Sequence, residues 1–142
     1  MEKLNQETKN QMFWMLQDVI SYFSKNPVKY RSKSLYGKCG YQSNGVTAGC
    51  AIGMYIDQDL AKELDDYEDS SILEIFEQCK SSFQKLPEWM KIMPIHFLSE
   101  LQALHDNDFN WDKNNLSKDG IDTVKEICEN FELPFKKLTF KK

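Results

Sequence analysis

Apolar residues recur at intervals of three and four along much of this chain, which is the spacing of amphipathic α-helices. The first segment shows this best, with one broad apolar face that consists of Leu4, Met12, Phe13, Met15, Leu16, Val19, Ile20 and Phe23. Asn26-Pro27 should end this helix, because proline disfavours helical geometry in the residue before it. The pattern predicts a core helix.

Shorter helices are predicted for the middle of the chain. A short buried helix should span about 50–56, and Asp57 can cap the helix that follows it. After a polar break, Ser70 or Ser71 should open one helix over 72–83, where the apolar residues again keep a helical spacing.

The C-terminal part predicts two longer helices. Pro87 and Pro94 can each begin a helix, since proline fits the first helical turn, and the segment after Pro94, IHFLSELQALHD, is strongly periodic. Ser117 should cap a final helix over 118–131 that ends at Leu133-Pro134.

No helical period survives between residues 27 and 49. A connection this long inside a compact domain is uncommon and is usually functional or disordered, and its three tyrosines and one cysteine argue against disorder. We expect a long ordered loop that leaves room for one short hairpin. The chain as a whole, residues 1–142, is predicted to be mainly α: a single compact domain of five to seven helices.

The composition, with 41% hydrophobic and 28% charged residues among 142, is ordinary for a globular protein that forms a core without disulfides or metals. No apolar run approaches the roughly 20 residues that cross a bilayer, and the first residues lack the layout of a secretion signal. The four cysteines form no CxxC motif and should be free thiols. We therefore expect a cytoplasmic protein without a membrane partner.

The net charge of −4 hides an uneven distribution. No acidic residue lies between Asp18 and Asp57, where four lysines and one arginine give +5, whereas residues 57–132 hold 19 acidic against seven basic residues, a balance of −12. A basic segment suits an anionic ligand, and the acidic remainder would repel the phosphates of a long duplex. The distribution favours an anionic small molecule and argues against duplex nucleic acid.

Three of the six glycines, at positions 45, 49 and 53, lie in the stretch SNGVTAGCAIGMYI. A loop that leads into a helix N-terminus presents unpaired backbone N–H groups and the positive end of the helix dipole, which together can bind an anion. Neither a phosphate-loop motif nor a GxGxxG fingerprint is present, so tight helix packing is an alternative explanation for the glycines. The residues predicted to contact a ligand here are Lys33, Lys38, Tyr41, Gly45, Thr47 and Gly49.

Cys50 stands at the start of the predicted short helix, where the helix dipole stabilises a thiolate and raises its reactivity. A catalytic cysteine needs an imidazole within reach, and His105, which is followed by Asp106, is the more suitable of the two histidines. The small apolar surroundings, AGCAIG, also fit a buried structural cysteine. A Cys50–His105–Asp106 enzyme is therefore an alternative, and the balance favours a protein that is not an enzyme.

The segment HDNDFNWDKNNLS, residues 105–117, alternates acidic and amide side chains as a calcium-binding loop does. Trp111 and Ser117 occupy the positions where such a loop requires glycine and glutamate, so turns and caps explain the segment better. Trp111 can form a wall for a flat ligand, and we expect it to act together with Asn110 and His105. Since no cysteine or histidine spacing fits a zinc site, neither a metal nor a cofactor is predicted.

A combined pattern runs through Gly49-Cys50-Ala51-Ile52-Gly53, Leu104-His105-Asp106, Asn110-Trp111 and the later LSKDG. Over roughly residues 39–128 it resembles a family of small uncharacterised proteins of phage and bacterial genomes. The resemblance implies no activity, cofactor or catalytic residue. It implies a setting in which small proteins often bind or sequester a component of the host.

The leading hypothesis is a small soluble protein that binds and sequesters an anionic, nucleotide-like molecule, as a phage-encoded counter-defence sponge would. One alternative is the Cys50–His105 enzyme acting on a small substrate. The other is an inhibitor whose acidic surface, over residues 57–112, docks on a basic host protein. A homo-oligomer stays open.

Overall fold

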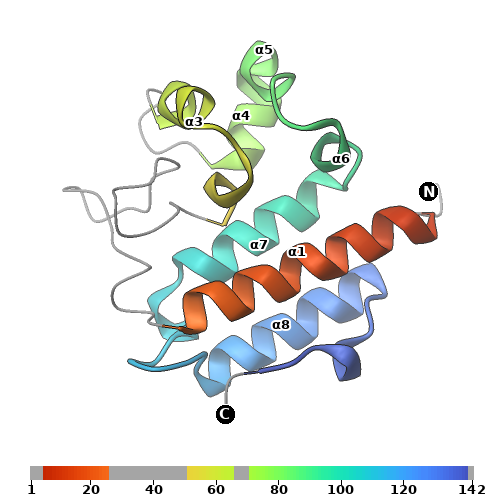
Figure 1. The fold of residues 1–142 in the computed structure, drawn as a ribbon, viewed down its shortest axis with the longest axis vertical. Helices are drawn as coiled ribbons and strands as arrows, with labels where there is room; N and C mark the ends of the chain where they lie inside the picture. The colour runs from red at the N-terminus through yellow and green to blue at the C-terminus, as the bar shows by residue number, and fades with distance from the viewer. Residues whose placement is uncertain (1–4, 26–50, 66–70, 141–142) are drawn as a thin grey trace.

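The structure, a computed structural model, describes residues 5–25, 51–65 and 71–140 (Figure 1). In these residues the chain forms seven α-helices and three 3-10 helices: α1 (Gln6–Ser24), η1 (Gly53–Tyr55), α3 (Gln58–Asp65), α4 (Ile72–Gln78), α5 (Lys80–Phe83), α6 (Glu88–Lys91), α7 (Ile95–Asp106), η2 (Asp108–Asn110), α8 (Lys118–Phe131) and η3 (Phe135–Lys137). The predicted mainly α fold is confirmed. The loop expected over 27–49 lies outside the described residues.

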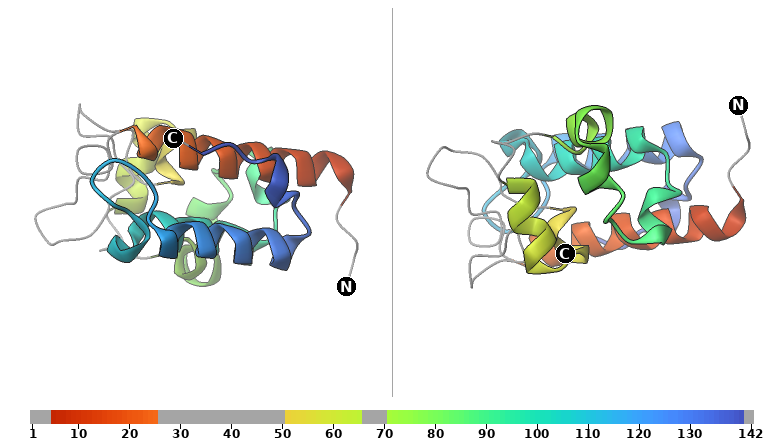
Figure 2. Two further views of the ribbon diagram at one scale, coloured as in Figure 1. Left: turned by 90° about the horizontal axis from the view of Figure 1, so that it is seen from below. Right: turned by 90° about the horizontal axis from the view of Figure 1, so that it is seen from above.

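Three long helices, α1, α7 and α8, form the body of the fold. α7 and α8 lie next to each other, and α1 packs across them as a second layer (Figures 1 and 2). α3 to α6 gather beside α7 on the side away from α8 (Figure 1), and α4 packs directly on α7. None of the helices in the described ranges combines the length and the apolarity that a membrane crossing needs.

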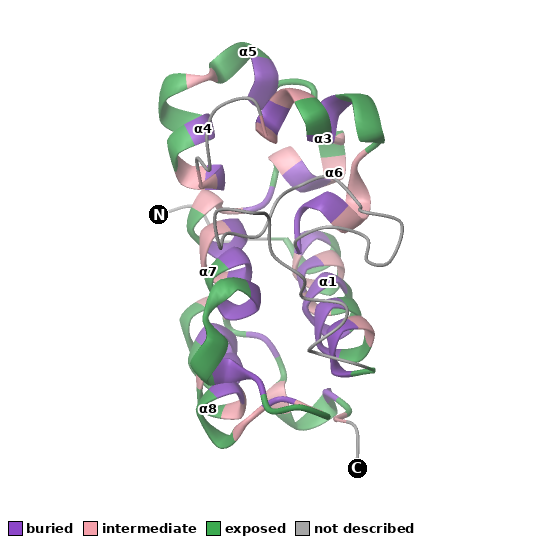
Figure 3. Cartoon of the chain, turned by 90° about the vertical axis from the view of Figure 1, so that its left-hand side faces the viewer, coloured by how far each residue is buried: buried purple, intermediate pink, exposed green. Residues whose placement is uncertain are grey.

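α1 begins at a side-chain cap and buries one complete face. The side-chain oxygen of Asn5 accepts a hydrogen bond from the backbone N–H of Thr8 at 2.7 Å, which satisfies a donor that the helix itself leaves unpaired. The buried apolar residues of α1, each at most 2% exposed, are Met12, Met15, Leu16, Val19, Ile20 and Phe23. Figure 3 shows buried residues on the sides of α1 and α7 that face each other.

The N-terminal caps predicted from the sequence are confirmed. The carboxylate of Asp57 accepts the backbone N–H of Leu60 at 2.8 Å, and the hydroxyl of Ser71 accepts that of Glu74 at 3.2 Å. The Ser117 hydroxyl caps α8 in the same way. These contacts are local in sequence, which is why the residue pattern predicts them.

The predicted helix boundaries at proline are also confirmed at the starts of α6 and α7, which follow Pro87 and Pro94 directly. At the other end of the fold, α8 stops at Phe131 because Glu132 adopts a left-handed backbone conformation with φ 56°. The next backbone N–H, that of Leu133, then bonds to the Cys128 carbonyl at 2.9 Å, which closes the last turn.

The single helix expected over 72–83 is wrong, because the chain breaks it at Cys79 into α4 and α5. Cys79 has φ −126° and ψ 57°, outside the helical region. The break turns the chain from α7 toward α3, where the Ser82 hydroxyl donates to a Glu63 carboxylate oxygen at 2.6 Å. Lys85 pairs with the other oxygen of Glu63 at 2.6 Å. The spacing of apolar residues does not predict these contacts, because they join polar side chains from segments that are distant in the sequence.

The short helix expected over 50–56 is a single 3-10 turn in its described part, 51–56. The Tyr55 N–H bonds to the Ile52 carbonyl at 3.1 Å, and Ile56 is already extended, with φ −122° and ψ 157°. The extended residue separates this turn from Asp57, the cap of α3, which follows at once. Between residue 51 and α3 the chain therefore forms one tight turn.

Gly120, in the first turn of α8, lies where another backbone segment passes closely. A methyl group at this position would overlap the backbone carbonyl of Asn110 and would lie 2.7 Å from a methyl carbon of Leu116. The glycine therefore permits the loop after α7 to pack against the start of α8, a role that no side chain can take.

We expect Gly120→Ala to lower the free energy of unfolding by about 2–3 kcal/mol, because the overlap is with backbone that cannot move aside. In an unconstrained helix the same change would stabilise by about 1 kcal/mol. Asp122→Ala, on the exposed face of the same helix, is the matched control and should change stability by less than about 0.5 kcal/mol. Urea unfolding measures both, and a Gly120→Ala protein as stable as the parent would contradict the close contact.

Candidate functional site

Most of the ligand-binding residues predicted from the sequence lie in the segment 26–50, outside the described residues. They are Lys33, Lys38, Tyr41, Gly45, Thr47 and Gly49, together with Cys50 of the alternative enzyme. Their predicted roles stay predictions. The remaining three, His105, Asn110 and Trp111, are described, and they come together at the C-terminal end of α7.

His105 is buried at the end of α7, with 1% of its surface exposed. Its Nδ1 lies 2.8 Å from a carboxylate oxygen of Asp106, and its ring meets the Phe23 ring edge-to-face at a centroid distance of 4.3 Å. His105 and Asp106, both named for the alternative enzyme, thus lie in contact, and the catalytic role stays a prediction. Because the imidazole is covered by α1 and its own helix, it contributes to the core where the two helices meet.

Asn110 and Trp111 bind the same backbone carbonyl. The Asn110 amide donates to the Leu104 carbonyl at 3.2 Å, and the Trp111 indole N–H donates to it at 3.0 Å. Leu104 is in the last turn of α7, where carbonyls have no partner within the helix. Both side chains therefore cap the C-terminal end of α7 by donating hydrogen bonds to it.

The same two side chains are also anchored on their other sides. The Asn110 oxygen accepts a hydrogen bond from the Thr123 hydroxyl of α8 at 3.2 Å, and the Trp111 ring packs edge-on against Phe23 at 6.3 Å between centroids. Trp111 is only 8% exposed, so little of its indole surface is open to a ligand in this structure. In the described residues this cluster joins α1, α7 and α8.

We expect Asn110→Ala to reduce the free energy of unfolding by about 1–3 kcal/mol, because the buried carbonyl of Leu104 and the half-buried hydroxyl of Thr123 each lose a hydrogen-bond partner. Lys113→Ala, in the same loop and exposed, should stay within about 0.5 kcal/mol of the parent. Thermal and urea unfolding give both values. If Asn110→Ala is as stable as the parent protein, Asn110 has no structural role and is again a candidate ligand-binding residue.

The described cysteines are not arranged for nucleophilic chemistry. Cys128 is 2% exposed, and burial, with a smaller effect of the neighbouring Glu129 charge, raises the pKa of its thiol to about 11. A thiol with so high a pKa holds almost no thiolate at neutral pH. Cys79 is half-buried at the break between α4 and α5. Within the described ranges, no three His, Cys, Asp or Glu side chains meet in a group that could hold a metal ion.

An open pocket of about 230 Å³ lies where α1, η1 and α6 meet. We call it the aromatic pocket, and the described residues that line it are Gln11, Trp14, Met15, Asp18, Tyr55 and Trp89. Three large aromatic side chains thus converge from positions 14, 55 and 89, which are far apart in the sequence. Trp14 is 62% exposed, while Tyr55 and Trp89 are half-buried.

The pocket walls are held by contacts among their own side chains. The Tyr55 hydroxyl donates to Asp18 Oδ2 at 3.0 Å, and the Tyr55 and Trp89 rings stand at 84° to each other with centroids 5.4 Å apart. Trp14 is supported by an edge-on contact with the Phe13 ring at 5.4 Å. Because Trp14 and Asp18 are four residues apart on α1, both project from the same side of the helix.

Sequence reasoning missed this pocket, although one signal pointed to it. Trp14 interrupts the polar side of the first helix: it lies between Phe13 and Met15 but does not belong to the apolar face that packs into the core. A tryptophan with no place in the core is a candidate for contact with a partner. Tyr55 and Trp89 gave no such signal, because only the fold brings them beside α1.

A second, more polar hollow of about 340 Å³ adjoins the other side of Trp14. It is bounded by Lys9, Glu132 and Lys137 among others, and Lys9 is already paired with Glu132 at 2.8 Å. Lys9, which is more buried than Lys137, is therefore already engaged in an ion pair within the protein. We therefore regard the aromatic pocket as the candidate site.

Burial raises the pKa of the Tyr55 phenol well above its ordinary value, and the charge and hydrogen bond of Asp18 raise it further. The phenol is therefore neutral at physiological pH and donates its proton to the carboxylate. The folded protein binds the phenol proton more tightly than the unfolded chain does. This tighter binding stabilises the fold by its full amount at pH values below the ordinary tyrosine pKa, about 10. This stability is lost as the pH rises above that value.

We expect the parent protein to lose stability relative to Tyr55→Phe between about pH 8 and pH 11, by about 1 kcal/mol, because the pocket is open and solvent screens part of the effect. Urea unfolding of both proteins at several pH values measures the difference and cancels the titration of the other tyrosines and lysines. A difference that does not change with pH would show that Tyr55 ionises freely in the folded protein.

Comparisons with models of protein families, with curated proteins and with solved structures found no match to this chain. The resemblance to small phage and bacterial proteins stays a prediction. The candidate site therefore rests on its own geometry.

Proposed function

We propose that the protein is a ligand-binding protein and that the aromatic pocket is a binding site on it. The observation that carries the proposal is the convergence of three aromatic side chains, from α1, η1 and α6, around one carboxylate. Small-molecule sites combine mostly apolar and aromatic walls with a few polar groups that fix orientation. The aromatic pocket has this composition.

The exposure of Trp14 supports the proposal energetically. Single exposed apolar residues are common on protein surfaces and need no explanation. Trp14, however, borders a pocket with two further aromatic rings, so a ligand placed there would remove several apolar surfaces from water at once. Covering roughly 100 Å² of tryptophan surface would contribute about 2.5 kcal/mol to binding.

The size of the aromatic pocket limits what it can hold. Pockets for drug-sized ligands measure roughly 300–1,000 Å³, and this one measures about 230 Å³. It suits a single ring, a small headgroup or one side chain of a larger partner. It would not enclose a whole nucleotide.

A second candidate function, sequestration of an anionic, nucleotide-like molecule, is favoured by the uneven charge of the sequence. The acid-free segment between Asp18 and Asp57 carries +5. Apart from Lys25 and Gly53, its basic residues and glycines lie outside the described residues, so this proposal rests on sequence. Because Asp18 would repel a phosphate, such a ligand would need contacts other than those of the aromatic pocket.

The two other hypotheses receive less support. An enzyme that uses Cys50 and His105 needs an accessible imidazole, and His105 is 1% exposed in this structure. An inhibitor of a host protein would use the acidic surface over 57–112, where exposed carboxylates such as Asp59, Glu74 and Glu88 do lie. Neither hypothesis explains why Trp14, Tyr55 and Trp89 surround an open pocket.

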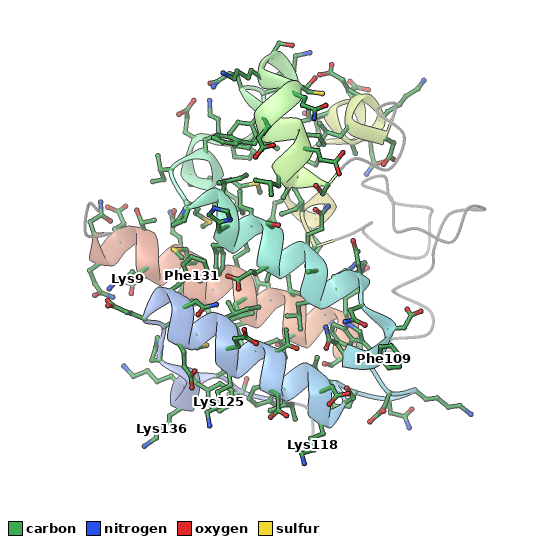
Figure 4. All side chains as sticks on the ribbon, turned by 180° about the vertical axis from the view of Figure 1, so that it is seen from behind. Lys9, Phe109, Lys118, Lys125, Phe131 and Lys136 are labelled. Carbon is green, nitrogen blue, oxygen red and sulfur yellow. The ribbon has the colours of Figure 1, made fainter. Side chains whose placement is uncertain are left out.

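We expect small aromatic and aliphatic compounds, tested as a panel of neutral, cationic and anionic members, to quench or shift tryptophan fluorescence and to raise the melting temperature. Trp14→Ala should weaken binding of pocket ligands about tenfold or more, since an exposed ring is lost without damage to the core. Phe109→Ala is the matched control, because Phe109 is 79% exposed and lies at the other end of the molecule from Lys9 (Figure 4).

The same panel, with nucleotides among its anionic members, separates the two candidate functions. A ligand of the aromatic pocket loses affinity in Trp14→Ala and keeps it in a Lys33→Ala/Lys38→Ala double variant. A nucleotide-like ligand of the basic segment should show the reverse. No binding by any member of the panel would refute both proposals.

A further inference from the structure

We propose that the aromatic pocket is selective for an organic cation, an alkylammonium group that lies against the indole and phenol rings beside Asp18. This inference rests on the proposed ligand-binding function and specifies the ligand class. It differs from the anionic ligand expected from the sequence, because that ligand was predicted from a different part of the chain.

The charge of the pocket is the first reason. Among the described residues that line it, Asp18 is the one with a charge; the others are Gln11, Trp14, Met15, Tyr55 and Trp89. A carboxylate beside a partly apolar surface attracts a cation more strongly than one in open water, because the effective dielectric constant is lower. The same carboxylate disfavours an anion.

The hydrogen bonding of Asp18 is the second reason. Its Oδ2 accepts the Tyr55 hydroxyl at 3.0 Å, which fixes the carboxylate on the pocket wall. None of the described residues donates a hydrogen bond to its Oδ1, and Asp18 is one of the residues that line the pocket. Asp18 is exposed, so a ligand can reach it without displacing a structural contact.

The aromatic rings are the third reason. The faces of aromatic rings carry partial negative charge, and a cation within about 6 Å of a ring centroid is attracted, most strongly by tryptophan. Two tryptophans and a tyrosine line this pocket, and the perpendicular Tyr55 and Trp89 rings, at 84°, supply two walls in different planes. Such walls can surround a rounded alkylammonium group from more than one side.

The tyrosine stays suited to this role over the physiological pH range. A phenol with the ordinary pKa of about 10 is already neutral in this range, and the raised pKa of Tyr55, caused first by burial and then by Asp18, moves its ionisation further from it. The pocket thus holds one negative charge on Asp18, and the phenol remains a donor to it.

The protein does not fill the pocket with a cation from the described part of its own chain. At the C-terminal cap of α1, the Lys25 ammonium nitrogen lies 5.9 Å from the centre of the Tyr22 ring, which is a contact of the same kind within the protein. No lysine or arginine from the described ranges lines the aromatic pocket.

A pair of ligands with the same shape tests the inference. Choline carries a trimethylammonium group, and 3,3-dimethylbutan-1-ol carries a neutral tert-butyl group of the same form. We expect the parent protein to bind choline about tenfold more tightly than the alcohol, measured by tryptophan fluorescence and by NMR shifts of the indole N–H signals. The alcohol measures the contribution of shape and apolar contact alone.

The variant Asp18→Asn removes the charge and keeps an oxygen that can accept the Tyr55 hydroxyl. It should reduce the preference for choline to less than about threefold and leave binding of the alcohol unchanged. Tyr55→Phe keeps the charge and should keep the preference. Melting temperatures of both variants confirm that they are folded, and Lys137→Ala, in the neighbouring hollow, should leave both ligands unaffected.

The results distinguish this inference from the proposed function. Equal binding of choline and the alcohol to the parent protein, or a full preference retained in Asp18→Asn, would overturn the cation site and leave a neutral ligand pocket. Binding of neither compound at millimolar concentration, with indole signals that do not shift, would overturn both proposals.

An alkylammonium group can belong to a free small molecule or to a lysine side chain of a partner protein. A short acetylated peptide with a central trimethyllysine provides the second arm of the experiment. Tighter binding of the peptide than of choline would identify a protein side chain as the source, and tighter binding of choline would identify a free amine. Both results support the cation site, provided that Asp18→Asn weakens the binding of whichever ligand binds more tightly.

Discussion

Burial of one face of α1 against α7 and α8 is the constraint on which the rest of this structure depends. Met12, Leu16, Ile20 and Phe23 must leave water, and their spacing leaves one rotation of the helix that buries all of them. This rotation fixes what the other side of α1 presents. It brings Trp14 to the surface, where the side chain forms the edge of the aromatic pocket rather than part of the core.

The C-terminal end of α7 shows a second constraint, that buried polar groups need partners. The Leu104 carbonyl has no partner within its helix and receives two, the Asn110 amide and the Trp111 indole. Their residue types, an amide and an indole beside a histidine, also occur in binding sites. Here the hydrogen bonds to backbone give them a structural role, and close packing at Gly120 holds the loop in place.

The two candidate ligand regions differ in the sign of their charge, and this difference bears on function. The described pocket holds the carboxylate of Asp18 among aromatic rings and attracts cations, whereas the sequence between Asp18 and Asp57 carries only positive charge. Tyr55, a wall of the pocket, lies at the C-terminal end of that acid-free segment. A ligand with both a cationic and an anionic group would satisfy both proposals, and two separate ligands would satisfy them equally.

The sequence by itself determined the helices, because they depend on contacts within about four residues. The apolar period of α1, the caps at Asp57, Ser71 and Ser117, and the start of α7 after Pro94 are all local features, and all were predicted correctly. The mainly α class follows from them. The break at Cys79 was not predictable in this way, because its cause is the packing of α5 against α3.

Only the tertiary structure decided which residues form a site. Trp14, Tyr55 and Trp89 become neighbours because three elements pack together, and no local pattern encodes a contact between residues 34 or 41 positions apart. The same is true of Trp111, whose burial depends on Phe23 of a helix far away in the sequence. Periodicity fixes which side of a helix is apolar, but the partner that covers this side, and the surfaces left uncovered, follow from how the whole chain packs.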